Sequence, residues 1–117
     1  MNRMSRINQQ MKREIGLIIH QELGDPRLQF VAITRAEVTA DLRHARVYFR
    51  ALGDAAQIEA ARMGLEKAGK LIRRMVSQTM NLRFTPELIF FYDDSLDKLN
   101  ELSLSPETSD EVSENEL

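Results

Sequence analysis

Residues 64–96 of the chain read GLEKAGKLIRRMVSQTMNLRFTPELIFFYDDSL, and this stretch decides the fold. It begins with a helical segment, turns before Pro86, and continues as a dense apolar strand from Leu88 to Tyr92. At about 100° per residue, the apolar side chains of residues 71–79 share one side of the helix, and basic side chains starting with Lys70 share the other. This pattern predicts a small α+β domain that offers positive charge to an anionic partner.

The helical region that leads into this strand is predicted to bend or break at Ala68, Gly69 and Lys70. Glycine in a helix interior costs about 1 kcal/mol relative to alanine. We therefore expect one helix before the interruption and a second helix from there to about Met80. Asp54 is placed as the N-cap of the first of these helices, with Gln57 completing a capping box.

The chain before residue 53 adds one long helix and two strands. Residues 4–23 form an amphipathic pattern, and Gly24-Asp25-Pro26 ends the helix. Residues 29–39 are rich in β-branched side chains, with a change of alternation that favours a bulge near Arg35-Ala36. Residues 43–51 alternate cleanly and follow a short turn, which predicts an antiparallel hairpin. The third strand is apolar at both its odd-numbered and its even-numbered positions, so we expect both of its faces to be buried.

The predicted order is α-β-β-α-α-β, with a mixed three-stranded sheet and the helices on one face. Residues 1–104 form a single domain that ends in a short helix, which Ser95 caps and which carries Leu96, Leu99 and Leu102. Residues 105–117 are acidic and polar without apolar periodicity, and we expect this tail to be disordered.

The charge is divided unequally along the chain. Residues 1–86 hold 15 Lys+Arg against 8 Asp+Glu, a net of +7, whereas residues 87–117 hold 1 against 10, a net of −9, which together give the overall −2. This asymmetry indicates a basic domain with an acidic tail. The tail is either a solubilising terminus or a segment that folds back on the basic surface and competes with RNA.

Composition excludes several classes of protein. The chain has no cysteine, which rules out disulfides and thiolate chemistry. No stretch approaches the roughly 20 apolar residues that span a bilayer, and the N-terminus lacks a signal-peptide core. We therefore expect a cytoplasmic protein that does not enter membranes. No heptad or extra apolar stripe is left over for self-association, so a monomer is expected.

Two segments of the chain, together with the order of its elements, resemble a known family. The order of elements, with MNLRFTPELIFFYDDSL at residues 80–96 and DLRHARVYF at residues 41–49, closely resembles ribosome-binding factor A, over roughly residues 3–100. The resemblance implies a single type-II KH-like domain and a non-enzymatic factor without cofactors. Such factors bind the immature small (30S) ribosomal subunit through 16S rRNA, support processing of the 5′ end of 16S rRNA, and matter most in the cold.

The pair of helices in this chain departs at two points from what KH domains and the family show. KH domains carry a Gly-x-x-Gly loop that clamps single-stranded backbone, and no such loop occurs here. The family shows Ala-x-Gly at the helix break, whereas this chain has Ala68-Gly69-Lys70, with the glycine one place early. Sequence-specific reading of a single strand is therefore not predicted.

Cations on the first helix, the second strand and the helix after the break are the predicted RNA contacts, because phosphates require several fixed charges on a rigid surface. For any single arginine, the alternative is an ordinary solvated face. Tyr48 either stacks on a base or is a partly buried edge tyrosine. The predicted RNA-binding residues are Arg3, Arg6, Arg13, Arg43, Arg46, Arg50, Lys67, Lys70, Arg73, Arg74 and Arg83.

Three other motifs are interpreted as structural. Residues 64–71 nearly match a phosphate-binding loop but lack its Ser/Thr and its preceding strand. Asp93-Asp94 follows a strand, as carboxylates of metal-dependent nucleases do, but capping and turn formation explain the pair more simply. His20 and His44 lie on polar faces and are interpreted as surface residues. We predict no catalytic residue, metal site or small-molecule substrate.

Two alternative functions remain open from sequence. The chain could be a module that binds another RNA or a protein partner through the sheet face or the acidic tail. An enzyme acting on nucleic acid would rest on Asp93-Asp94 alone.

Overall fold

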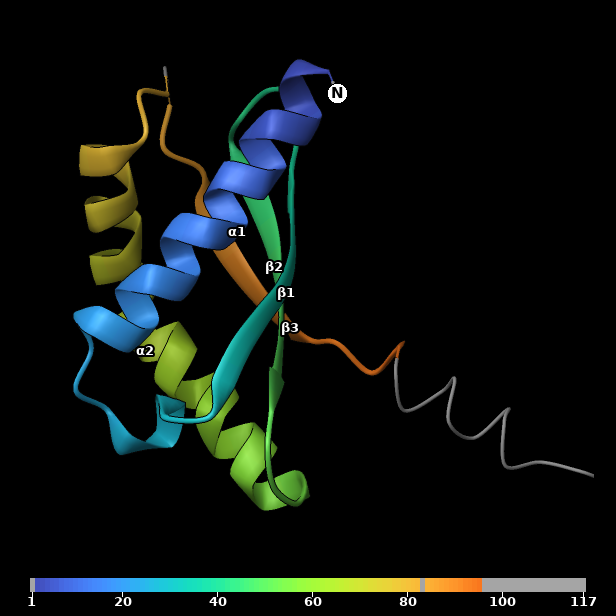
Figure 1. Cartoon of the computed structure of the whole chain (residues 1–117), viewed down its shortest axis with the longest axis vertical. Coiled ribbons are helices and arrows are strands. Elements are labelled where there is room, and N and C mark those ends of the chain that lie inside the picture. The colour runs from blue at the N-terminus through green and yellow to red at the C-terminus, as the bar shows by residue number, and fades with distance from the viewer. Residues whose placement is uncertain (1, 83, 96–117) are drawn as a thin grey trace, which may run out of the picture.

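The computed structural model describes residues 2–82 and 84–95, which hold two helices, a 3₁₀ turn and three strands (Figure 1). The predicted final helix, Arg83 and the acidic tail lie outside the described residues, Ser95 excepted. The elements are α1 (Arg3–Gln21), η1 (Pro26–Leu28), β1 (Val31–Val38), β2 (His44–Ala51), α2 (Ala55–Thr79) and β3 (Glu87–Tyr92).

The three strands form one mixed sheet in the order β1-β2-β3, so β2 is the central strand. β1 pairs with β2 antiparallel, and β3 pairs with β2 parallel after the crossover through α2. Helix α1 crosses the sheet diagonally and contacts β1 and α2, and α2 contacts β2 and β3 (Figure 1). The predicted mixed sheet with helices on one face is confirmed.

The core lies between these helices and the inner face of the sheet. Alternate residues of β2, which are Ala45, Val47 and Phe49, are fully buried, as the alternation predicted. The buried side of α1 comprises Ile7, Met11, Ile15, Ile18 and Ile19. The apolar stripe read from the sequence is therefore the face that packs on the sheet.

The predicted break at Ala68-Gly69-Lys70 is absent, because α2 is one continuous helix of 25 residues. A bend, which was the predicted alternative, is seen in Figure 1, where the two halves of α2 run in different directions. Its buried side chains keep a single phase across the site: Ala61, Leu65, Ile72 and Val76 lie within about 60° of one another at 100° per residue. Gly69 does not adopt a positive φ, and a Cβ placed there would meet no atom within 4 Å. The helix thus tolerates the glycine, and the predicted Asp54–Gln57 capping box is present at its start.

The bulge predicted near Arg35-Ala36 is present at the adjacent Thr34, since the register shifts between Ile33 and Arg35. The prediction about the third strand needs correction. β3 is not buried on both faces: Phe90 points into the core, whereas Ile89 and Phe91 are each 42% exposed. The two described helices lie on one face of the sheet, and Ile89 and Phe91 lie on the other.

Asp93 fastens the end of β3 to β1. Its backbone N–H donates to the Phe49 carbonyl at 2.7 Å, and its carboxylate accepts from the Thr34 hydroxyl at 2.6 Å. The Ser95 N–H and hydroxyl donate to the other carboxylate oxygen. Hydrogen bonds from Thr34 and then Ser95 lower the pKa of Asp93 from 3.8 to about 2. The carboxylate therefore acts in a turn, as predicted.

Gly69→Ala is expected to raise the free energy of unfolding by about 0.5–1 kcal/mol, because a continuous helix favours alanine and the site has room for the methyl group. Urea unfolding measures the change. Gly64→Ala is the matched control on the same helix, where the added Cβ would lie 3.2 Å from both Asp25 Oδ2 and Leu28 Cδ2, and its gain should be smaller or absent. A loss of stability for Gly69→Ala would argue for a break at this position.

Asp93→Asn keeps an acceptor for Thr34 but removes the titration. Because folding lowers the pKa of Asp93, its stabilisation is present above pH 3.8 and is lost as the pH falls toward 2. We expect the wild type to exceed the variant by about 1 kcal/mol at neutral pH, a figure reduced for the partial exposure of the carboxylate, and to lose this margin in acid. Unfolding free energies measured from neutral to acid pH test this. A margin independent of pH would contradict it.

Candidate nucleic-acid interface

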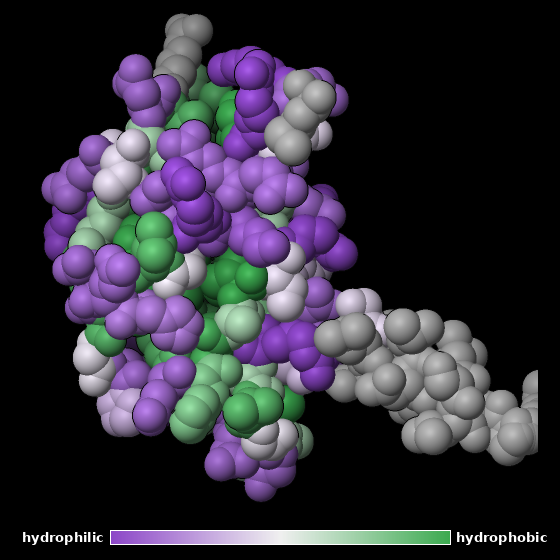
Figure 2. Space-filling view, viewed as in Figure 1, coloured by the Kyte–Doolittle hydropathy of each residue, from purple (hydrophilic) through white to green (hydrophobic). Residues whose placement is uncertain are grey.

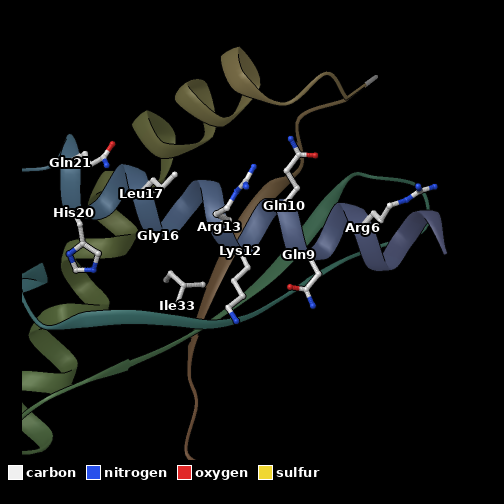
Figure 3. A pocket seen from close by; sticks show the side chains of 10 residues that line it. All are labelled: Arg6, Gln9, Gln10, Lys12, Arg13, Gly16, Leu17, His20, Gln21 and Ile33. Carbon is white, nitrogen blue, oxygen red and sulfur yellow. The ribbon is translucent and has the colours of Figure 1, made fainter. Parts of the chain in front are cut away.

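Cations from successive turns of α1 border a groove that crosses the outward side of this helix (Figure 3). Lys12 and Gln9 point toward β1, on the side of Ile33, whereas Gln10 and Arg13 point to the other side of the helix (Figure 3). No carboxylate lines the groove. Its lining residues are Arg6, Gln9, Gln10, Lys12, Arg13, Gly16, Leu17, His20, Gln21 and Ile33.

Most of the charge on α1 is not neutralised locally. Within residues 2–82 and 84–95, no carboxylate pairs with Arg3, Arg6 or Lys12. Arg13 approaches Glu14 at 3.6 Å, but its side chain remains 71% exposed, and exposed ion pairs of this kind are weak. The positive field of α1 is therefore available to an external anion.

His20 secures the C-terminal end of α1. Its Nε2 lies 2.7 Å from the Val31 carbonyl, so the ring joins α1 to the start of β1 while it lines the groove. This contact gives His20 a structural role, and it keeps the groove between helix and strand in a fixed shape.

A second group of cations lies on the C-terminal half of α2. Lys70, Arg73 and Arg74 line a hollow with Ser77 and Thr85. Nε and Nη2 of Arg73 both donate to the Thr85 carbonyl, at 3.2 and 2.9 Å. A neutral carbonyl orients the guanidinium without cancelling its charge, which suits it to bind phosphate. Lys67 is also exposed on α2 and lies near Asp25, whose pKa it helps to lower after the stronger effects of Arg27.

The predicted cations of the second strand do not join these groups. Arg46 and Arg50 alternate with the buried residues of β2, so they extend from the sheet face opposite the helices. Arg46 approaches Glu37 at 3.5 Å, and Arg50 donates to the Asp93 carbonyl at 2.7 Å. Arg43, at the start of β2, lies over the Phe84 ring at 5.6 Å. The predicted RNA-binding residues are thus divided between two faces.

Tyr48 lies on that same outer face and is half-buried. It sits on the central strand rather than on an edge. The Arg35 guanidinium lies 4.0 Å from its ring centroid, and the Phe91 ring stacks on it at 5.6 Å. The tyrosine therefore already has aromatic and cationic neighbours within the chain.

Other arginines are held by carboxylates and are poor candidates for RNA contact. Arg27 pairs with Asp25 at 2.7 Å, and Arg62 bonds both Glu59 and Glu66. The amphipathic pattern did not single out Lys12, Gln9 or Gln10. At 100° per residue, Lys12 lies about 20° from Ile19, at the border of the apolar stripe. The helical projection therefore did not assign Lys12 to the polar face.

Competing chemistries find no support in the described parts of the chain. Residues 64–71 lie inside α2, without the strand-loop-helix setting of a phosphate-binding loop. Across residues 2–82 and 84–95, no group of three His, Asp or Glu side chains could hold a metal ion. Neither described helix is long and apolar enough to cross a membrane.

The exposed polar surface on the α1 side is seen in Figure 2, where hydrophilic side chains surround smaller apolar areas. Solved structures share the fold of this chain. The chain matches a crystal structure of ribosome-binding factor A from Thermus thermophilus with a TM-score of 0.71 and 24% identity, over 78% of this chain and 97% of that one. The α+β fold with a mixed three-stranded sheet is thus shared.

Two further likenesses concern sequence and assembly. Ribosome-binding factor A of Halothermothrix orenii is 41% identical over 103 residues, which are 86% of this chain and 84% of the relative. A Thermus thermophilus ribosome-binding factor A model, fitted into a cryo-EM map of a 30S complex with that factor, matches with a TM-score of 0.62 and 25% identity, over 74% of this chain and 91% of that one.

The family model described as ribosome-binding factor A matches residues 3–104, which include every helix and strand of the structure. Together with the 41% identity over most of the chain, this match confirms the resemblance drawn from residues 41–49 and 80–96. The chain belongs to the ribosome-binding factor A family.

Proposed function

We propose that this protein is an assembly factor of the small ribosomal subunit. It binds the immature 30S subunit through 16S rRNA, supports processing of the 5′ end of that rRNA and late maturation, and is needed most in the cold. It acts as a cytoplasmic monomer, without a cofactor and without catalysing a reaction itself. Membership of the family and the 30S complex of the Thermus thermophilus relative support this proposal.

The main structural support for this proposal is a set of cations on α1 and α2 that have no partner among the described carboxylates. Arg6 and Lys12 on α1, and Lys70 and Arg74 on α2, form no ion pair with the described carboxylates. Each such cation that meets a phosphate releases condensed counterions, which drives binding at low salt. The paired Arg27 and Arg62 would first have to break contacts with Asp25, Glu59 or Glu66.

The same surface offers groups that distinguish RNA from a simple polyanion. Gln9, Gln10 and Gln21 line the α1 groove beside the cations. Their amides donate and accept hydrogen bonds, as recognition of phosphate oxygens and 2′-hydroxyls requires. Without a Gly-x-x-Gly clamp, recognition rests on the shape and backbone of folded rRNA rather than on a single-stranded sequence.

Replacing α1 and α2 cations should weaken binding to immature 30S subunits in a salt-dependent way. We expect Arg73→Ala with Arg74→Ala, and separately Arg6→Ala with Lys12→Ala, to lower affinity. The slope of log affinity against log salt should shrink by about 0.7–0.9 for each rRNA phosphate that the variant no longer neutralises. Co-sedimentation with mature and immature subunits across a salt series measures both quantities.

The matched control is Arg27→Ala with Arg62→Ala. This control also removes two positive charges, but from side chains that already form ion pairs with carboxylates. Its affinity and salt slope should stay close to those of the wild type. Equal losses for the control and the two test pairs would reduce the effect to net charge and would refute the assignment of this surface.

Cells that lack the protein should accumulate 16S rRNA with an unprocessed 5′ end, more strongly at low temperature. Wild-type protein should restore processing, whereas the Arg73→Ala, Arg74→Ala variant should not, because it cannot hold the subunit. Primer extension on 16S rRNA at two temperatures provides the measurement. Full restoration by a variant that fails to bind subunits would separate processing from binding and contradict the proposal.

A further inference from the structure

The outward side of α1 has a glycine inside the groove that its cations border. Gly16 lies well within the helix Arg3–Gln21, where glycine is the least favourable residue except proline. Its φ is not positive, so the backbone conformation does not require glycine. A Cβ placed on Gly16 would meet no atom within 4 Å, so the packing of the helix does not require glycine either.

The missing side chain lowers the surface of the helix between two cations. Lys12 and Arg13 precede Gly16 by four and three residues, so both side chains are its neighbours on the helix surface. Arg13 and Leu17 lie on one side of Gly16 (Figure 3). Lys12 and His20 lie on the other side (Figure 3). Gly16 therefore forms a low point of the α1 groove, with one cation on each side of it.

An open glycine position does not by itself identify a binding site. A Cβ placed on Gly69 would also meet no atom within 4 Å, yet Gly69 does not line the hollow on α2. Gly16 differs because it lines a groove of about 780 Å³, which is within the size range of ligand sites. Glycine is also the residue that lets a ligand approach the backbone closely. The low point at Gly16 is therefore suited to a ligand that contacts the helix backbone.

The charges around this low point suit an extended polyanion. Within residues 2–82 and 84–95, no carboxylate pairs with Lys12, and the Arg13 side chain remains 71% exposed beside Glu14. The residues that line the groove run from Arg6 to Gln21, about 22 Å along the helix axis, which is longer than a single phosphate requires. Each phosphate that meets one of these cations releases counterions. An RNA strand therefore matches both the charge and the length of the groove.

We propose that a strand of rRNA crosses α1 at Gly16, with its sugar–phosphate backbone against the helix and its phosphates beside Lys12 and Arg13. The adjoining ribose or base lies against Leu17, an apolar side chain that is 44% exposed. This inference rests on the proposed function and adds to it a steric requirement. Gly16 contributes to binding through the space that it leaves and not through a charge.

Gly16→Leu tests this requirement, because leucine fills the low point without changing the charge of the groove. Leucine favours a helix more than glycine does, so the unfolding equilibrium constant should fall about threefold, which shows that the variant folds. Its affinity for immature 30S subunits should nevertheless fall at least about tenfold, because the strand no longer reaches the helix. Urea unfolding measures the stability, and co-sedimentation across a salt series measures the affinity.

The matched control is Ala56→Leu, which also adds a leucine at an exposed helix position. Ala56 lies in the first turn of α2, about 20 Å along the helix before Lys70, and it lines neither the α1 groove nor the α2 hollow. This control should bind subunits as the wild type does. Equal binding by the wild type and Gly16→Leu would overturn this inference and leave the proposed function intact. No binding by the wild type would overturn both.

The steric and charge effects should be coupled if one strand experiences both. Lys12→Ala with Arg13→Ala should weaken subunit binding in the wild-type background. In the Gly16→Leu background, the same two changes should cost much less affinity, because the strand is already displaced from the cations. Additive losses would assign Gly16 and the cations to separate contacts and would contradict a shared crossing point.

UV cross-linking of the wild-type protein on immature subunits, followed by mass spectrometry, tests the identity of the ligand. Nucleotide adducts on groove residues such as Leu17 or His20 are the expected result. An amine-reactive reagent provides the opposing measurement, because it joins Lys12 to any lysine of a neighbouring protein. A link from Lys12 to a ribosomal protein, without nucleotide adducts in the groove, would assign the groove to a protein and overturn the proposal.

Discussion

The parallel pairing of β3 with β2 is the constraint on which the rest of the structure depends. Parallel neighbours cannot be joined by a tight turn, so the chain must leave β2, cross the sheet and return in the same direction. Helix α2 makes this crossing over 25 residues and packs Leu65, Ile72 and Val76 against the sheet. Because α1 packs on the same side, one face of the sheet becomes the core, and neither described helix covers the other, open face.

This one-sided arrangement also sorts the charges. Cations on the outward sides of α1 and α2 share the helical side of the molecule, whereas Arg46 and Arg50 extend from the open face. On the open face the arginines have neighbours within the chain, such as Glu37 for Arg46. On the helical side several cations have none among the described carboxylates. The fold thus places these cations of α1 and α2 on one side of the molecule and the arginines of β2 on the other.

Much of this could be predicted from sequence, because periodicity reports burial directly. The apolar stripe of α1, the alternation of β2 and the Asp54–Gln57 box each appear where the pattern placed them. The errors arose where local propensity was outweighed by tertiary packing. Gly69 weakens a helix locally, yet the buried residues on both sides share one phase and α2 remains continuous. The apolar run of β3 indicated burial, but no described helix covers its second face.

The partners of the cations could be predicted from sequence only where they are near neighbours along a helix. Glu59 and Glu66 stand three residues before and four residues after Arg62, where ion pairs form on a helix, whereas nothing in the sequence indicates that Arg73 meets Thr85. The structure holds Arg62 between Glu59 and Glu66 and orients Arg73 on the Thr85 carbonyl, with its charge intact. The continuity of α2 bears on the proposed binding. Because α2 is one continuous helix, the cations near its end would already be placed relative to those of α1, and the proposed binding of RNA by both groups would require little further ordering. A flexible hinge at Gly69 would instead let the two groups move independently.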